Sequence, residues 1–338
     1  MNLEQALVQR WYGRPGWLWL LLPLEWLYRI ATAVRRMLFR AGLRRRFRAD
    51  VPVIVIGNIN VGGTGKTPLA TALCELLQRA GFRPGIISRG YGAQPPAFPH
   101  LVAAGDSAAV CGDEPLLLAR RTHCPVAIAP RRADAARALL AARGCDVLIC
   151  DDGLQHYALH RDIELAVVDA ARGFGNGHCL PVGPLREPAT RLGTVDAVLW
   201  NGAAVPATAH TVAAAQYAFQ LEPATFVQLG SAHAAPPRTW CHQHPRVHAV
   251  AGIGNPARFF ATLRALGCDV IEHAFPDHHV FTATELLFDD DLPVVMTEKD
   301  AVKCDALALP RHWFLQVRAA LPESLGAAIV DKLRALQR

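Results

Sequence analysis

The sequence of 338 residues has no Cys-x-x-Cys pair, no internal repeat and no low-complexity tract. Its nine cysteines are odd in number and scattered, which excludes a disulfide-rich secreted fold and favours reduced thiols in a cytosolic core. The N-terminus does not resemble a cleavable signal. With 51% hydrophobic residues, the chain can bury a large core, so a disordered or fibrous protein is excluded. We expect one large domain or two moderate ones.

Positive charge is concentrated in one short segment. The net charge is +6, and residues 29–48 contain eight arginines and no acid, so the rest of the chain is slightly acidic. A nucleic-acid-binding protein more often spreads basic residues along a groove with stacking aromatics. We therefore expect an anionic partner other than nucleic acid, and nothing in the sequence points to a protein partner.

An apolar, tryptophan-rich segment precedes these arginines. As a helix, residues 17–27 would reach only about 16 Å, against about 30 Å of hydrocarbon in a bilayer, so they cannot span it. Beyond Pro23 one helix face is apolar and the other basic. The apolar positions are Leu27, Ile30, Ala31, Val34, Met37 and Leu38, and the basic ones are Arg29, Arg36 and Arg40. We interpret residues 1–50 as a monotopic membrane anchor; the alternative is a helix packed on its own domain.

A nucleotide-binding motif opens the predicted globular core, residues 51–202. Residues 53–56 are typical of a buried parallel strand, and a glycine-rich loop and a helical pattern follow. In such a loop Lys66 would reach the outer phosphates of a nucleotide and Thr67 would bind Mg²⁺. The strict motif has glycine where this chain has Asn60, a residue that tolerates positive φ, so the loop remains feasible. The predicted nucleotide-binding residues are Val61, Gly62, Gly63, Thr64, Gly65, Lys66, Thr67 and Pro68.

Two acids end a second predicted buried strand. Residues 145–150 lead into Asp151 and Asp152, where a P-loop fold holds the carboxylate that binds Mg²⁺ directly or through water. The two side chains would point to opposite sides if the strand geometry continued. Both are therefore candidate metal ligands, and the sequence does not choose between them.

Strand and helix patterns alternate through the core. Strands are predicted at residues 84–88, 125–129, 163–168 and 195–200, with helices at 113–121 and 131–143. This alternation predicts an α/β fold with a doubly wound, mainly parallel sheet and a site beyond the carboxyl ends of its strands. Residues 203–246, with a strand-like stretch at 216–221, are interpreted as a connecting region. Residues 247–338 are predicted to form a second, smaller α/β lobe across a cleft.

Several short peptides occur in a characteristic order from about Val51 to Lys303. They are Gly57–Asn58, Val61–Pro68, Ser88–Gly92, Gly112–Pro115, Asp151–His156, Pro184–Pro188, Phe275–His279 and Thr297–Lys303. Together they resemble the tetraacyldisaccharide 4'-kinase family, the lipid A kinases of Gram-negative bacteria. The N-terminal segment looks like that family's membrane-docking helix, and the family's loop is also atypical at Asn60.

The resemblance implies a reaction and its setting. ATP, with Mg²⁺, would give its γ-phosphoryl group to the 4'-hydroxyl of an acylated glucosamine disaccharide 1-phosphate, yielding lipid IVA. The enzyme would work as a peripheral protein at the cytosolic face of the inner membrane, where the lipid surface meets the Trp- and Arg-rich helix.

The resemblance also implies a catalytic pair. Asp113 resembles the family's catalytic aspartate and His278 the histidine that pairs with it. Because the two come from different lobes, closure of the cleft would assemble them. As alternatives, Asp113 is only a helix N-cap, or His279 takes the place of His278.

Other polar residues are predicted to hold the acceptor. Arg89 and Arg186 lie in loops bounded by glycine or proline and suit a phosphate, and Glu187 belongs to the same set. Gln155 and His156 follow the strand-end acids and are interpreted as contacts to the acceptor or to the ligands of the metal; the alternative is loop residues that satisfy backbone groups. The cluster at 298–300 is read as a solvated salt-bridge turn and is left out of the catalytic set.

Two other classes of function are considered. The first is a membrane-associated ATPase switch with a deviant P-loop and no small-molecule acceptor, but its signature lysine would fall at Val61. The second is a non-catalytic lipid-binding adaptor, which does not explain Lys66 and Thr67.

Overall fold

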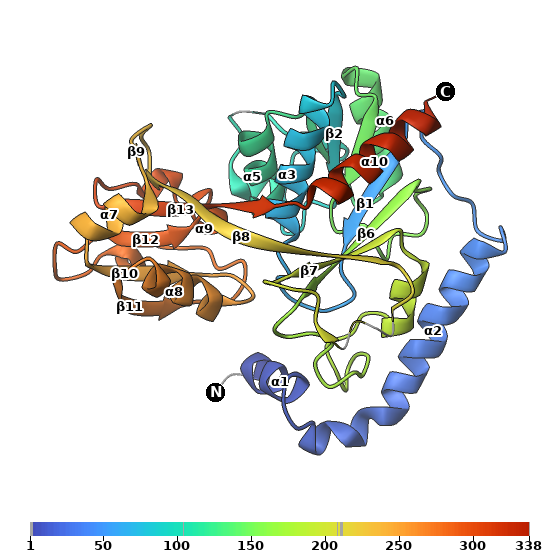
Figure 1. The fold of residues 1–338 in the computed structure, drawn as a ribbon, viewed down its shortest axis with the longest axis horizontal. Coiled ribbons are helices and arrows are strands. Elements are labelled where there is room, and N and C mark those ends of the chain that lie inside the picture. The colour runs from blue at the N-terminus through green and yellow to red at the C-terminus, as the bar shows by residue number, and fades with distance from the viewer. Residues whose placement is uncertain (1–2, 104, 208, 210–211, 338) are drawn as a thin grey trace.

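The computed structural model describes residues 3–103, 105–207, 209 and 212–337, so a few positions within the expected ranges 1–50, 51–202, 203–246 and 247–338 lie outside the described residues. Two lobes share one sheet, and a helical N-terminal arm lies beside the first of them (Figure 1). The arm contains α1 (Leu3–Trp11), the 3-10 helix η1 (Gly16–Leu21) and α2 (Leu22–Arg40).

The first lobe alternates strands and helices. Its strands are β1 (Val53–Gly57), β2 (Pro84–Ser88), β3 (His100–Leu101), β4 (Val126–Ile128), β5 (Val147–Cys150), β6 (Ile163–Asp169) and β7 (Ala197–Asn201). Its helices are α3 (Lys66–Arg79), α4 (Ala108–Cys111), α5 (Asp113–Thr122), α6 (Arg132–Ala142) and the 3-10 helix η2 (Ala189–Thr194).

The second lobe is smaller. Its strands are β8 (Ala215–Gln228), β9 (Ala234–Ala235), β10 (Arg246–Ala251), β11 (Asp269–Ala274), β12 (Val294–Thr297) and β13 (His312–Ala320). Its helices are α7 (Pro237–Gln243), α8 (Pro256–Ala265), η4 (Thr284–Leu286), α9 (Glu298–Ala301) and η5 (Asp305–Leu307), and α10 (Glu323–Leu336) ends the chain.

The sheet of the first lobe is parallel from β7 through β6, β1, β5 and β2 to β4, and only the edge strand β3 is antiparallel. Successive side chains of β1 pack on opposite faces: Ile54 and Ile56 against α3 and α5, Val53 and Val55 against α6. The predicted α/β class with a mainly parallel sheet is confirmed. All nine cysteines are buried and free.

Strand β8 joins the two lobes. Its first residues, 215–219, pair in parallel with β7, and residues 220–228 pair antiparallel with β13. One strand thus continues the sheet from one lobe into the other (Figure 1). The expected connecting region 203–246 therefore contains a strand longer than the predicted 216–221, because both ends of β8 find a neighbouring strand.

The last helix returns to the first lobe. In α10, Leu325, Ile329 and Leu333 pack in the same core cluster as Leu69 and Leu73 of α3. The range 247–338, expected to form the second lobe, thus ends in a helix of the first lobe. A buried apolar stripe at helical spacing identifies such a helix but not the sheet face that it covers.

The N-terminal arm exposes apolar side chains. Leu27, Ile30, Val34 and Met37 of α2 form an outward stripe and are 43–64% exposed, and Trp26 is 66% exposed. The alternative of a helix that buries its apolar stripe on its own domain does not describe α2. Among the described residues, no helix is both long and apolar enough to cross a membrane.

Candidate active site

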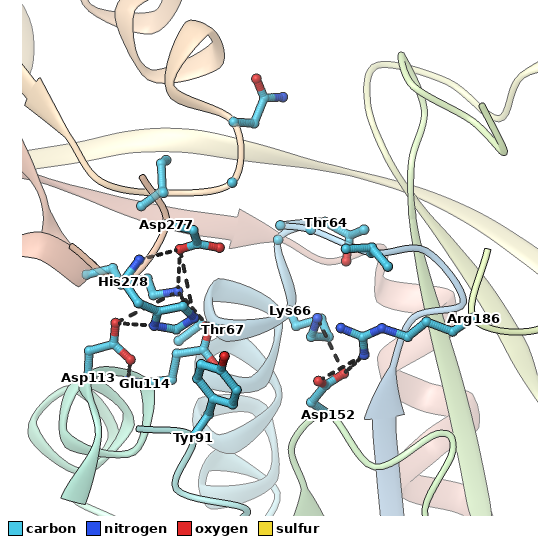
Figure 2. Close-up of a pocket in the computed structure, with 18 of the residues that line it drawn as sticks. Thr64, Lys66, Thr67, Tyr91, Asp113, Glu114, Asp152, Arg186, Asp277 and His278 are labelled. Atoms are coloured by element: carbon cyan, nitrogen blue, oxygen red, sulfur yellow. Dashed lines mark hydrogen bonds and ion pairs between the residues drawn. The ribbon is translucent and has the colours of Figure 1, made fainter. Parts of the chain in front are cut away.

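A cavity of about 1030 Å³ lies at the carboxyl ends of β1 and β5. Its wall includes the glycine-rich loop after β1 and the segment that follows β5. Residues of the second lobe and of the N-terminal arm complete it. Figure 2 shows Lys66, Asp152 and Arg186 on one side and Asp113 and His278 on the other. All predicted nucleotide-binding and acceptor-binding residues line this cavity.

The glycine-rich loop has the backbone that a phosphate cradle requires. Gly62 and Gly65 have φ of 101° and 93°, where a side chain would be strained, and α3 begins immediately afterwards at Lys66. Asn201, at the end of β7, donates a hydrogen bond of 3.0 Å to the carbonyl of Thr64. A Cβ atom added at Gly65 would lie 2.5 Å from the side-chain nitrogen of Asn201. Asn201 therefore anchors the glycine-rich loop to the end of strand β7.

Asn60 does not adopt the positive φ that would replace the missing glycine. It continues the extended chain and bridges antiparallel to Leu185. On either side, Val61 N donates to Pro184 O at 2.8 Å and Arg186 N donates to Ile59 O at 2.6 Å. The segment 184–186 thus braces the start of the loop, which is why the loop needs no glycine there.

Lys66, Asp152 and Arg186 form an ion-pair chain. The carboxylate of Asp152 lies 3.4 Å from Lys66 Nζ and 3.2 Å from an Arg186 nitrogen. Burial raises the pKa of Asp152, but the two cations outweigh it and bring the pKa to about 2. Asp152 has φ of 45° in a turn, so the expected continuation of strand geometry does not hold at this residue.

Asp151 is buried to 1% exposure, and neither carboxylate oxygen has a hydrogen-bond partner among the described residues. Burial, and then the charges of Glu114 and Asp152, raise its pKa above the ordinary value. A buried carboxylate without a partner is costly unless a cation or donor compensates it.

Asp113 and His278 meet across the lobes. Oδ2 of Asp113 lies 2.9 Å from Nδ1 of His278 (Figure 2). Gly112, with φ of 88°, is the N-cap of α5 and Asp113 is the first helical residue, so the simple N-cap alternative does not apply. The contact is already formed here, so assembly of the pair does not need the further closure that the sequence analysis expected.

The pair changes the titration of both groups. Burial raises the pKa of Asp113, but the hydrogen bond from His278 and the charge of Lys299 lower it below the usual range. The hydrogen bond to Asp113 raises the pKa of His278 despite burial and Lys299. The alternative partner, His279, instead contacts Glu285 at 3.0 Å.

The turn that carries His278 is strained. Its φ is 62°, in the left-handed region that side chains rarely adopt. Its backbone N–H donates to Gly252 O and to the carboxylate of Asp277. Because of this conformation, the side chains of His278 and His279 point in different directions. The sequence alone does not show which of the two faces Asp113.

Lys299 was missed by the sequence analysis. The cluster at 298–300 is not a solvated turn: Lys299 is 17% exposed and Asp300 is fully buried. Lys299 Nζ reaches Glu114 at 3.0 Å and Asp277 at 3.2 Å. The signal that could have found it is the alternation of acid and base in one matched peptide directly after a buried strand.

The acceptor-side residues divide into bound and unbound groups. Gln155 donates to Asn58 O at 3.0 Å and to Glu187 at 3.1 Å, and Tyr157 donates to the other carboxylate oxygen of Glu187. Arg89 is exposed and lines the cavity. Glu187 and Gln155 thus hold the wall, whereas Arg89 presents its charge to the cavity.

His156 lies among arginines. Burial lowers its pKa, and the charges of Arg132, Arg161 and Arg35 lower it further, to about 4. Arg132 is buried and donates to the carbonyl of Asp152 at 3.3 Å. A neutral His156 can accept or donate hydrogen bonds beside these cations.

The N-terminal arm supplies part of the wall. Tyr28, Thr32 and Arg35 of α2 line the cavity, and the hydroxyl of Tyr28 donates to Arg186 O at 2.8 Å. Their spacing places them on the helix face opposite the exposed apolar stripe. This second stripe was not predicted from the sequence, in which only the apolar and the basic faces of the segment stand out.

The chain is similar to a known family over almost its whole length. Residues 17–334 match the family model described as tetraacyldisaccharide-1-P 4'-kinase. The sequence is 52% identical over 323 residues to the tetraacyldisaccharide 4'-kinase of Ectopseudomonas mendocina, with 94% of each chain covered. It is 47% identical over 338 residues to that of Hahella chejuensis, with 98% of each covered.

A solved structure shares the fold. The crystal structure of LpxK from Aquifex aeolicus in complex with ATP has a TM-score of 0.78 and 26% sequence identity, and covers 94% of this chain and 99% of its own. The similarity therefore includes both lobes and the joining strand.

Proposed function

The chain belongs to the tetraacyldisaccharide-1-P 4'-kinase family and is an ATP-dependent kinase of a lipid A precursor, and we propose that its Asp113–His278 pair accepts the proton of the acceptor's 4'-hydroxyl. The observation that carries this assignment is the 2.9 Å contact between the two side chains at the mouth of a phosphate-binding loop. Phosphoryl transfer needs two substrates held in line, charge neutralised on the transferred group and a base for the hydroxyl.

Asp113 is the proton acceptor in this proposal. Its lowered pKa keeps the carboxylate ionised at neutral pH, and His278 fixes its orientation by donating from Nδ1. Oδ1 of Asp113 accepts a bond from its neighbour Glu114 N at 2.8 Å, which limits rotation of the carboxylate. The pair is thus held ready to receive a proton from the sugar hydroxyl.

The glycine-rich loop and Lys66 hold the triphosphate of ATP. Backbone N–H groups of the loop and the N-terminus of α3 face the phosphates, and Lys66 neutralises the outer ones. The second lobe approaches closely, because a Cβ at Gly254 would lie 2.8 Å from Gly63 N. Arg172 spans the lobes through a bond of 3.2 Å to Gly254 O.

The acceptor lies in the same cavity, beside the ion-pair chain of Lys66, Asp152 and Arg186. Arg89, His156 and Arg186 contact the acceptor sugar and its phosphate in this proposal, supported by Gln155 and Glu187. The guanidinium groups of Arg89, which is exposed, and Arg186, which is partly buried, line the cavity wall and suit a phosphate monoester.

The residues present fit a Mg²⁺ ion. Asp151 offers two carboxylate oxygens without partners, and Asp152 and Thr67 line the cavity beside Lys66. No group of three or more His, Cys, Asp or Glu side chains in the described ranges converges as a metal cage. That agrees with Mg²⁺, which often takes one or two carboxylates together with phosphate oxygens and water. Bound there, the ion would neutralise phosphate charge.

We place the protein at the cytosolic face of the inner membrane of a Gram-negative bacterium as a peripheral protein. The exposed stripe of α2 and the tryptophans of η1 would enter the headgroup layer. The opposite face of α2 lines the cavity, so an acceptor with its acyl chains in the membrane can present its sugar to the site.

An acceptor-dependence assay tests the function. Purified protein with ATP and Mg²⁺ should release ADP only when a tetraacylated glucosamine disaccharide 1-phosphate is supplied in micelles, and mass spectrometry should find one added phosphate at the 4'-position. ADP release that is equal with and without acceptor would favour the ATPase switch and contradict the kinase assignment.

A further inference from the structure

Lys299 is held in a fixed position at the centre of the interlobe charges. The residue before it, Glu298, accepts two hydrogen bonds from Arg121, at 2.9 and 3.0 Å. The residue after it, Asp300, is fully buried and closes a cap with Thr297, whose hydroxyl accepts from Asp300 N at 3.2 Å and donates to its carboxylate at 2.6 Å. Both neighbours of Lys299 are therefore held in place, and Lys299 itself lines the cavity.

The ammonium group of Lys299 faces four polar side chains. Nζ lies 3.0 Å from Glu114, 3.2 Å from Asp277, 3.4 Å from Nε2 of His278 and 3.9 Å from Asp113. Glu114 and Asp113 belong to the first lobe, and the other groups to the second. Among the residues that the structure describes, Lys299 is the one lysine or arginine that pairs with all three carboxylates, and it also lies 3.4 Å from the imidazole.

The two ring contacts of His278 within hydrogen-bond distance determine where its ring proton sits; Asp277 Oδ1, 3.9 Å from Nε2, is too far to accept a hydrogen bond from that nitrogen. An ammonium group can only donate, so Nε2 must present a lone pair to Lys299. A carboxylate can only accept, so Nδ1 must carry the hydrogen that faces Asp113. The reversed tautomer would set a donor against a donor at Lys299 and a lone pair against a carboxylate at Asp113.

We propose that Lys299 is a positioning residue of the kinase reaction, which holds the neutral Nδ1–H tautomer of His278 so that the imidazole donates to Asp113 and leaves that carboxylate unprotonated. This role rests on the proposed function of the Asp113–His278 pair.

The charges around His278 explain why a lysine is needed. The groups that face the imidazole cluster are Asp113 and Glu114 of α5, Asp277 of its own turn, Lys299 of α9 and the ring of Tyr91, whose centroid is 5.1 Å away. Three carboxylates would favour the doubly protonated imidazolium. The hydrogen bond to Asp113 already raises the pKa of His278, and Lys299 opposes that rise. Burial lowers the pKa of Lys299, but the same three carboxylates outweigh burial and raise it.

Lys299→Met and Lys299→Arg test the proposal through the pH profile of kcat/KM. Without the cation, His278 stays protonated to higher pH, so we expect the acidic limb of Lys299→Met to move up by about one unit, and kcat to fall about 10- to 100-fold. Because arginine keeps the positive charge, the acidic limb of the Lys299→Arg profile should lie at the same pH as in the wild type. Lys332→Met, an exposed-lysine control on α10, should leave the profile unchanged. A rate lowered equally at every pH, with the limb unmoved, would overturn the proposal.

A measurement on the wild-type protein is independent of activity and of the folding of any variant. In ¹⁵N NMR spectra of histidine-labelled protein, the resonances of His278, assigned with His278→Asn, should show a protonated Nδ1 and an unprotonated Nε2. A protonated Nε2 near neutral pH would overturn the proposal. If the expected tautomer is found but no acceptor is phosphorylated, the kinase function fails while the tautomer assignment stands.

Discussion

The hydroxyl of Tyr28 in α2 donates a hydrogen bond of 2.8 Å to the backbone carbonyl of Arg186 at the cavity wall. The backbone N–H of Arg186 in turn donates to Ile59 O at 2.6 Å, at the entry to the glycine-rich loop. The Arg186 side chain pairs with Asp152, which pairs with Lys66. Arg186 thus connects α2, the helix with the exposed apolar stripe, to the glycine-rich loop.

Tyr28→Phe should weaken this connection. The variant loses one partly buried hydrogen bond, worth about 0.5–1.5 kcal/mol, so we expect kcat/KM to fall by up to roughly tenfold while vesicle binding is unchanged. Thr32→Val is the matched control, because Thr32 also lines the cavity but its hydroxyl bonds only to carbonyls of its own helix. Steady-state kinetics and vesicle sedimentation provide the measurements. Equal losses in both variants would count against a specific connection.

Asp113→Asn should separate turnover from nucleotide binding. The amide keeps the size of the side chain but cannot accept the hydroxyl proton, so kcat should fall about 10²- to 10⁴-fold. The Kd for ATP, measured by calorimetry, should change little. Asp106→Asn is the control, since Asp106 also contacts a histidine, His100 at 2.7 Å, but does not line the cavity. An unchanged kcat in Asp113→Asn would exclude Asp113 as the base.

Replacing Trp26, Leu27 and Ile30 together by glutamine should detach the protein from lipid. Because these side chains are exposed, the free energy of unfolding should stay near that of the wild type, but affinity for anionic vesicles should fall at least about 100-fold. Activity on acceptor in bilayers should drop far more than activity on acceptor dispersed in detergent. The control changes Val280, Leu287 and Leu336, which are also exposed, to glutamine. Similar vesicle binding in both triple variants would refute the anchor.

His156 should make the fold sensitive to mild acid. Its folded-state pKa is about 4, against an ordinary value of 6.5, so between these values the unfolded chain takes up a proton that the folded chain does not. Stability from this residue is therefore present above the higher value and is lost as pH falls toward the lower one, by about 1–2 kcal/mol after allowance for partial exposure.

His156→Gln should reduce that loss. Urea unfolding at about pH 7.5 and about pH 5 should show a smaller difference in the free energy of unfolding for the variant than for the wild type. His242→Gln, at an exposed position on α7, should behave as the wild type. If His156→Gln and the wild type lose the same stability over this range, His156 is not the group responsible.

Local pattern was enough to predict the backbone of the glycine-rich loop. The β-branched strand, the glycines and Lys66 are adjacent in sequence, and their chemistry is tied to a local geometry, φ above zero and a helix N-terminus. Asn60 was expected to fit the loop by adopting a positive φ, and this reason was wrong. The start of the loop is instead held by a backbone bridge from Asn60 to Leu185, which is far away in the sequence. Such long-range partners leave no periodic signal.

Lys299 shows the opposite case. From sequence, residues 298–300 are three alternating charges, which usually describe a solvated turn. In the fold the same residues are closed between two lobes, and the lysine meets carboxylates from Glu114 and Asp277. The burial of Lys299 depends on the packing of elements that are distant in sequence. Because of that burial, Lys299 is a fixed charge and not part of a solvated surface ion pair.

The order of apolar and polar residues by itself determined the parallel α/β core, the glycine-rich loop, the two strand-end acids and the amphipathic helix, because each depends on neighbours within one or two elements. Only the tertiary structure decided that α10 returns to the first lobe, that β8 joins both lobes and that His278 rather than His279 meets Asp113. These choices depend on which surfaces bury one another and on one strained backbone angle, and neither is encoded in local spacing.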